Sequence, residues 1–450
     1  MNTKVIQRLD NIIEFFLCAF VFTLPFSKAM VEIFAHGVIG FWIIKKIISG
    51  PARREFKEFA KPYAIGIGIP LLAFLLLNFL STVFSISFPL SAEGFVGKLL
   101  PSVLLFVIVA ETINTRDKLQ RLAVVFLSSM FLLSVDAMFQ RVFNFDFFRF
   151  RDMEPYLYVR AAFKNPNNFA GWLTFMIPLA LSLWFFFDTK FVSLSFKRNW
   201  LRNKIRPFLS VICILLAASL LLTRSRGALI AVIISLFFIG IIRREKIVSG
   251  ILVFLLLLFI ISPAGVKDKI FASIAAKDKV SKGIIARGQL WSEAAGLIKD
   301  SPFLGTGPNT YDTAGRRYKV GNGLGFYPHN SYLRMGAEVG LLGLVSFLLF
   351  IFMFFKISLR RLKESNDGFC SPLLLGLLSG VFAFLLHSFV DTNLYDLQLG
   401  NLMWFIMGFA FAVQNYLNKA ATKSDKTSTV NPLYFTGTIQ DEMLLMEHEY

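Results

Sequence analysis

Long runs of apolar residues recur from one end of the chain to the other, separated by short polar segments. Each run approaches the roughly 17–25 residues that an α-helix needs to cross a bilayer. Lipid offers no hydrogen-bond partners to unpaired backbone groups, so spanning runs must be helical. The pattern predicts twelve transmembrane helices, at residues 11–27, 30–48, 64–84, 96–113, 119–138, 168–188, 207–223, 227–242, 247–263, 338–356, 372–390 and 398–416.

The composition excludes a water-soluble fold. Hydrophobic residues make up 55% of the chain and charged residues 17%, against about 45–50% and about 25% in soluble domains. The apolar surplus is spread along the whole chain, so no single soluble core could hide it. The three cysteines are Cys18 and Cys213 in apolar runs and Cys370 in a short polar loop, which excludes a disulfide framework and a cysteine metal cluster. We therefore expect an all-α polytopic membrane protein embedded in a lipid bilayer.

Lys and Arg gather in alternate short loops, which places these loops and both termini in the cytoplasm. The chain then divides into four parts. They are nine spans over 1–263, a large helical loop on the outer side over 264–337, three spans over 338–417 and a cytoplasmic tail over 418–450.

The outer segments are also basic, within a formal net charge of +18. Basic residues outnumber acidic ones in 264–337 and recur in 139–167 and in the 223–227 link. A long loop can be exported despite its charge, so solubility is one interpretation. An anionic ligand at the outer face is the one we favour. Nucleic acid is not expected, because the basic stretch 264–287 lacks the interleaved aromatics that stack on bases.

Several arginines are candidates for binding that anion. Arg224 and Arg226 lie between two short spans, where a charge usually faces a cavity or a partner, and Arg160 precedes the sixth span. Snorkelling or anchoring at the membrane interface is the alternative for all three. Arg316 and Arg317 are secondary candidates in the large loop.

Arg287 has a more specific position. It opens a predicted helix that stops before Pro302, and its three- and four-residue spacing sets it on an apolar face with Trp291, Ala294 and Ile298. We therefore expect Arg287 to point toward the transmembrane body. Arginine binds phosphate through bidentate, permanently charged hydrogen bonds.

His329 and Asn330 lead into the tenth span. Asn330 fits a helix N-cap, as does Asn165, which precedes Pro166. His329 lies beside the positive end of the helix, and a neutral imidazole can accept a proton near pH 7. A structural role is the alternative for both. Should His329 not be the base, Asp391 and Asp396 in the last outer loop are the next candidates.

Some chemistries find no support in the sequence. It contains neither a phosphate-binding loop nor a dinucleotide glycine fingerprint. The outer loops carry no Asp-X-Asp pair and no His, Cys and carboxylate spacing typical of a metal site. We expect no nucleotide, cofactor or metal.

These residues resemble the O-antigen ligase and polymerase superfamily of bacterial inner-membrane enzymes. The resemblance covers about 140–345. Its landmarks are Arg287-Gly-Gln-Leu-Trp291, Pro302-Phe-Leu-Gly305-Thr-Gly307, and His329-Asn330 followed after nine residues by Gly340-Leu-Leu-Gly343. Arg160 with Asn165-Pro166-Asn167, and Ser225-Arg226-Gly227, are similar to further family segments.

The resemblance implies a glycan donor on undecaprenyl diphosphate, used at the periplasmic face. In the ligase branch a sugar hydroxyl of lipid A core attacks the anomeric carbon and inverts it. By resemblance, His329 and Arg287 are catalytic. Arg160, Arg226, Arg224, Arg316, Arg317 and Asn330 contact the diphosphate or glycan.

Other branches share this loop and differ in the acceptor. An O-antigen polymerase uses a second lipid-linked glycan, and a protein O-oligosaccharyltransferase uses a protein Ser or Thr. The pattern at His329 is most similar to ligases, and no outer domain suits a folded protein acceptor. A non-enzymatic transporter of the same lipid is least favoured, because no internal repeat is evident in the sequence.

The orientation generates a first test. A cysteine introduced at Lys282 should react with a membrane-impermeant thiol reagent in cells whose inner membrane is intact. Labelling that requires opening of the inner membrane would reverse both the topology and the side on which substrate is used.

Overall fold

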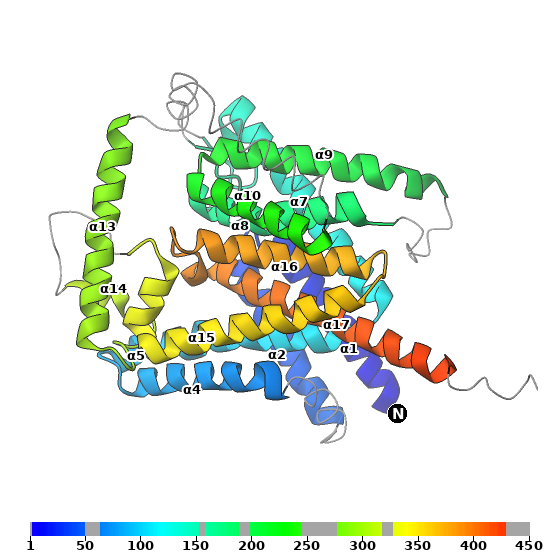
Figure 1. The fold of residues 1–450 in the computed structure, drawn as a ribbon, viewed down its shortest axis with the longest axis horizontal. Coiled ribbons are helices and arrows are strands. Elements are labelled where there is room, and N and C mark those ends of the chain that lie inside the picture. Colours follow the sequence, from blue (N-terminus) through cyan, green and yellow to red (C-terminus); the bar gives the residue numbers. More distant parts are fainter. Residues whose placement is uncertain are drawn as a thin grey trace, which may run out of the picture.

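The computed structural model describes residues 2–49, 64–152, 158–188, 199–244, 277–316 and 327–428. The described chain is a bundle of helices with one two-stranded hairpin (Figure 1). In order, the elements are α1 (Asn2–Thr23), α2 (Lys28–Ser49), η1 (Ala64–Gly68), α4 (Ile69–Val83), α5 (Phe88–Ala92), η2 (Glu93–Leu99), α6 (Leu100–Thr112), α7 (Arg116–Phe143), β1 (Phe145–Asp146), β2 (Arg151–Asp152), α8 (Pro166–Phe186), α9 (Asn199–Thr223), α10 (Arg226–Arg243), α13 (Lys277–Asp300), α14 (Tyr311–Gly315), α15 (Ser331–Glu364), α16 (Cys370–His387), η5 (Asn393–Tyr395) and α17 (Leu397–Ser428).

The all-α polytopic membrane class is confirmed. Within the described residues, nine helices are long and apolar enough to cross a membrane. They correspond to the third to eighth and tenth to twelfth expected spans. The first two expected spans fall in α1 and α2, each a 22-residue helix. The ninth, 247–263, lies outside the described residues, so the total of twelve stays a prediction.

Polar residues at the predicted positions begin the helices. Thr115, Asn165 and Asn330 are the N-caps of α7, α8 and α15, and each accepts a backbone N–H of the first turn. Such a cap satisfies a donor that the helix itself leaves unpaired. The two asparagine caps confirm the structural interpretation of Asn165 and Asn330.

The centre of the bundle is formed by α8, α16 and α17, whose apolar segments are the most buried. Small residues allow α16 to approach α8 closely: a Cβ added at Gly376 would lie 2.8 Å from Cα of Leu179, and one at Gly380 would lie 2.6 Å from O of Phe175. Small residues four apart are a common means of packing membrane helices. This contact holds the end of α16, where His387 lies, in a fixed place.

The bundle has two distinct ends. At one, Arg116 pairs with Asp367 at 2.8 Å and Lys46 with Glu111 at 2.7 Å. At the other, α13 crosses the ends of the bundle helices, on the side away from the N-terminus (Figure 1). The turn that follows α13, the start of α15 and the turn after α16 all lie at this second end.

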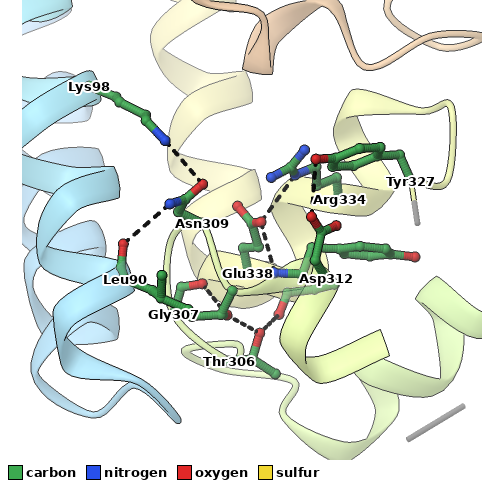
Figure 2. A network of polar contacts seen from close by, with 12 residues as sticks. Leu90, Lys98, Thr306, Gly307, Asn309, Asp312, Tyr327, Arg334 and Glu338 are labelled. Atoms are coloured by element: carbon green, nitrogen blue, oxygen red, sulfur yellow. Dashed lines mark hydrogen bonds and ion pairs between the residues drawn. The ribbon is translucent and has the colours of Figure 1, made fainter. Parts of the chain in front are cut away.

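α15 is continuous along its length except at Gly340, whose φ of 74° and ψ of 175° break the helix. The turn 301–310 packs into this break, and Figure 2 shows Thr306 and Gly307 of this turn near Glu338. N–H groups of Thr306 and Gly307 donate to the carbonyls of Ala337 (3.0 Å) and Glu338 (2.8 Å), and the hydroxyl of Ser81 in α4 also donates to Glu338 O (2.9 Å). The carbonyls freed by the break are therefore satisfied.

Several element boundaries differ from the expected ones. α15 begins at Ser331, not 338, because the capped half-helix before Gly340 is part of it. α17 runs to Ser428, beyond the expected end at 416. α16 ends at His387, so this residue marks the end of the helix and does not lie within the 372–390 span as expected.

The break generates a stability test. A Cβ at Gly340 would collide with the backbone of Phe303 and Leu304, and a side chain at this positive φ is strained. Gly340→Ala should lower the free energy of unfolding by at least about 3 kcal/mol or prevent folding.

Gly40→Ala is the matched control, because no heavy atom lies within 4 Å of a Cβ there and alanine favours a helix interior. Thermal unfolding in detergent compares the two variants. Equal melting temperatures would show that the turn 301–310 does not occupy the break.

Candidate active site

The first functional residues lie at the start of α15. His329 precedes the cap Asn330 and adopts a left-handed φ of 48°, unusual for a residue with a side chain. Its Nδ1 lies 3.3 Å from Oδ1 of Asp391, in the turn after α16. Asn330 uses Oδ1 to accept the N–H groups of Tyr332 and Leu333. The strained backbone thus turns His329 toward a carboxylate while Asn330 begins the helix.

Hydrogen bonds fasten this helix start to the turn that carries Asp391. Ser331 N donates to Ser388 O at 2.9 Å, and Ser331 Oγ donates to Asp391 O at 3.0 Å. The hydroxyl of Tyr332 donates to Leu385 O at 2.8 Å. The His329–Asp391 contact therefore bridges two segments that are already held together.

The two side chains of the pair differ in exposure: His329 is 42% exposed and Asp391 12%. Burial raises the pKa of the Asp391 carboxyl, but the hydrogen bond from His329, the electrostatic effect of His387 and the hydrogen bond from the N–H of Thr392 together outweigh it and hold that pKa below its usual range. Asp391 is thus a carboxylate at neutral pH. With Nδ1 directed at Asp391, Nε2 is the imidazole nitrogen available to another group.

α13 brings Arg287 to the same end. Trp291 Nε1 donates to the carbonyl of Pro328, next to His329, at 2.9 Å. Arg287 lies one helical turn before Trp291 on the same face, is half-buried, and its positive charge acts on the His387 ring. Ala294 on this face is fully buried. The expected inward direction of the face agrees with these contacts.

The start of α10 places Gly227, the neighbour of the exposed Arg226, against His387. A Cβ on Gly227 would lie 3.3 Å from Cδ2 of the His387 ring. The Nδ1 of that fully buried ring is 2.9 Å from Nδ2 of Asn393, two residues after Asp391. His387 thus contacts the segments that carry Arg226 and Asp391. These contacts follow from the position of His387 at the end of a helix and could not be inferred from its residue type.

Arg160 and Arg224 lie on adjoining segments. Val159 N donates to Leu222 O at 3.3 Å, and the Arg224 guanidinium covers the Tyr158 ring at 5.3 Å. Arg160 is half-buried and its Nη1 donates to Lys164 O at 3.5 Å. This backbone link joins the segment before α8 to the end of α9, whose last residue lies three positions before Arg226.

The remaining candidates are less central. Arg316 is exposed at the end of α14, and Arg317 lies outside the described residues. Asp396 accepts a hydrogen bond from Asn168 Nδ2 at 2.6 Å and lies 3.6 Å from Lys28 Nζ. Asp391, which the sequence suggested only as a substitute for His329, is its partner instead. The two residues are 62 positions apart in the sequence, and nothing near either one signals the pairing.

This arrangement can perform two kinds of chemistry. A histidine whose Nδ1 is held by a carboxylate can accept a proton at Nε2 from a hydroxyl group. Arginines at the ends of neighbouring helices can hold an anion such as a phosphate. Both capacities meet at one end of the bundle.

Comparison with known proteins adds a family. Residues 211–348 match the family model described as O-antigen ligase. The match includes Arg224, Arg226, Arg287, Arg316, Arg317, His329 and Asn330, whereas Arg160 and Asp391 lie outside it. A comparison with curated proteins finds no match.

The pKa of Asp391 predicts a pH dependence of stability. A carboxyl whose pKa is lowered by folding stabilises the folded state above its unfolded pKa of about 3.9, and this contribution is lost as the pH falls through the folded pKa. Asp391→Asn should cost about 1–3 kcal/mol at pH 7. The difference from the wild type should shrink below about pH 4. Thermal unfolding from pH 3 to 7 measures it, and a constant difference would exclude an ionised, hydrogen-bonded Asp391.

Proposed function

Residues 211–348 carry an O-antigen ligase family domain, and on that premise we propose that this protein is an O-antigen ligase. It transfers a glycan from undecaprenyl diphosphate to a sugar hydroxyl of lipid A core. The observation that carries the proposal is the His329–Asp391 contact, set among arginines at one end of a membrane-spanning bundle.

In this proposal His329 is the general base. Asp391 holds Nδ1–H, orients the ring and stabilises the imidazolium that forms. The acceptor hydroxyl oxygen attacks the anomeric carbon from the face opposite the diphosphate and forms the new glycosidic bond. The bond from that carbon to the diphosphate oxygen breaks, undecaprenyl diphosphate leaves with the electron pair, and the hydroxyl proton passes to Nε2. The reaction needs no nucleotide, because the diphosphate linkage supplies the energy.

Arginines stabilise the leaving diphosphate. Arg287 and Arg226 are assigned this role first, because Gly227, next to Arg226, packs on the His387 ring and the charge of Arg287 acts on the same ring. Arg160 binds from the adjoining segment, with Arg224, Arg316 and Arg317 contacting glycan or diphosphate further out. Fixed positive groups aimed at developing charge lower the barrier most effectively. Asn330 has its Oδ1 committed to the helix cap, so only its Nδ2 contacts the glycan.

We assign the end that carries the site to the periplasm and the protein to the bacterial inner membrane. Residues 1–263 and 338–417 then supply the spans, 264–337 the periplasmic loop and 418–450 the cytoplasmic tail. The basis is the distribution of Lys and Arg over the loops.

The function is tested by reconstitution. Purified protein in liposomes receives lipid-linked glycan and lipid A core, with EDTA and without nucleotide. We expect glycosylated lipid A core. Longer lipid-linked glycan in a parallel reaction without lipid A core would indicate a polymerase, and modification of an added Ser/Thr peptide would indicate a protein glycosyltransferase. Activity that requires added magnesium or manganese would refute the metal-independent reaction.

Variants separate binding from chemistry. His329→Ala should lower the transfer rate by roughly 10²–10⁴-fold with donor binding nearly intact. Arg287→Ala should weaken both donor binding and transfer. Arg287→Lys should recover only part of the loss, because an ammonium cannot reproduce the two-pronged hydrogen bond.

Each variant must first be shown to be folded and monodisperse. A folded His329→Ala protein with near wild-type transfer would remove His329 from the mechanism. Unchanged donor affinity in Arg287→Ala would move the diphosphate to other arginines.

A further inference from the structure

Arg334 is a charged residue that the proposed mechanism leaves without a role. It lies on the first half of α15, before the break at Gly340, and its side chain is only 8% exposed. Its guanidinium lies over two aromatic rings, 4.8 Å from the Tyr327 centroid and 4.0 Å from the Tyr395 centroid. These two contacts restrain the guanidinium.

A network of polar contacts fixes the same group laterally. Arg334 Nε donates to Oε1 of Glu338 at 3.0 Å, and that oxygen also accepts the N–H of Tyr311 at 3.1 Å. The Tyr327 hydroxyl donates to Asp312 Oδ2 at 3.0 Å. Figure 2 shows Arg334 directed at Glu338, with Tyr327 beside it. Because Glu338 balances its charge, Arg334 is not one of the cations available to an anionic ligand.

Stability alone explains such a pair poorly. Two charges taken out of water lose hydration energy that their attraction often fails to restore, and apolar residues of similar size are commonly as stable or more so. A buried Arg–Glu pair can instead specify one arrangement of its neighbours. The role of the Arg334–Glu338 pair therefore depends on which segments the guanidinium contacts.

Its two rings come from the two segments that carry the base and its partner. Tyr327 lies two residues before His329, and Tyr395 lies four residues after Asp391. A cation over an aromatic ring contributes about 0.5–2 kcal/mol. Arg334 thus draws together the same two segments that the His329–Asp391 contact bridges.

The catalytic contact needs such support. At 3.3 Å it lies just beyond the usual N–H···O range of about 2.7–3.2 Å, so a small separation of the two segments would break it. The hydrogen bonds of Ser331 hold the backbone of α15 to the turn after α16, but they do not contact the Tyr327 side of His329. Arg334 supplies a contact on that side.

We propose that Arg334 is a positioning residue, whose guanidinium holds Tyr327 and Tyr395 so that His329 and Asp391 stay in contact. The proposal rests on the proposed function for its effect on catalysis, and on geometry alone for its effect on His329. Arg334 itself touches no substrate in this account.

The first test is Arg334→Lys, which keeps a charge near Glu338 and loses the planar group over the rings. Misplacement of a catalytic group by about 1 Å can cost up to about 10²-fold. We expect kcat per folded protein to fall by about 10–100-fold, while KM for the lipid-linked donor changes by less than about threefold. Arg360→Lys is the control: Arg360 forms the same i,i+4 pair, with Glu364, at the other end of α15, and is 84% exposed. It should behave as the wild type.

A second pair of variants, at Tyr395, tests the same proposal and remains usable if Arg334→Lys does not fold. Tyr395→Phe keeps the ring against the guanidinium and loses the hydroxyl, whereas Tyr395→Leu removes the ring. Phe should keep kcat within about threefold of the wild type, since the ring contact survives. Leu should reproduce the loss seen with Arg334→Lys. Equal effects of Phe and Leu would overturn the role of the rings.

A readout besides activity separates this proposal from the proposed function. Mass spectrometry measures the rate at which diethyl pyrocarbonate modifies His329 in the purified proteins. The rate should rise at least threefold in Arg334→Lys and Tyr395→Leu, because a ring released from Asp391 is more accessible, and should stay unchanged in Arg360→Lys. If the wild type transfers no glycan, this rate still decides the positioning role. Rates and kcat equal to those of Arg360→Lys would overturn it.

Discussion

The arrangement of the end that carries His329 depends on one constraint, that a helix broken in a membrane protein must have its freed backbone groups satisfied from within the protein. At Gly340 the carbonyls of Ala337 and Glu338 lose their helical partners and take the N–H groups of Thr306 and Gly307 and the hydroxyl of Ser81 instead. The turn 301–310 is therefore part of the bundle. Because α13 ends at Asp300, the turn also fixes where that helix, with Arg287, can lie.

Within the described residues, the candidate site is built from helix ends. The start of α15 supplies His329, the end of α16 supplies His387 and the turn to Asp391, and the start of α10 supplies Arg226. Helix starts carry partial positive charge, which favours anions nearby. The close packing of α8 on α16 at Gly376 and Gly380 holds these ends in fixed positions. The ends are close in space although they come from distant parts of the chain.

Local features were readable from the sequence because local rules govern them. The apolar runs predicted nine helices of the described chain, and the caps Asn165 and Asn330 followed from residue type next to a helix start. The turn glycines Gly305 and Gly307 do adopt positive φ. Two further features are local in the same sense. Gly340 marks a break, and Arg334 and Glu338 are four apart, the spacing of an ion pair on a helix, so Arg334 does not add to the free positive charge of this end of the bundle.

Long-range contacts could not be read in the same way. Asp391 and His329 pair across 62 positions, and nothing near either residue indicates its partner. His387 resembled a residue in the middle of a span, because apolar side chains continue to Val390. Only the position of the end of α16 in three dimensions shows that the His387 ring contacts Gly227 and Asn393.

The central claim is that the diphosphate of the donor binds beside the His329–Asp391 pair. A structure of the full chain with undecaprenyl diphosphate bound, determined by electron cryomicroscopy in lipid nanodiscs, tests it most directly. We expect diphosphate density in contact with Arg287 and Arg226, on the side of His329 that Nε2 faces. Density at the opposite end of the bundle, near Arg116 and Asp367, or away from these arginines, would contradict it.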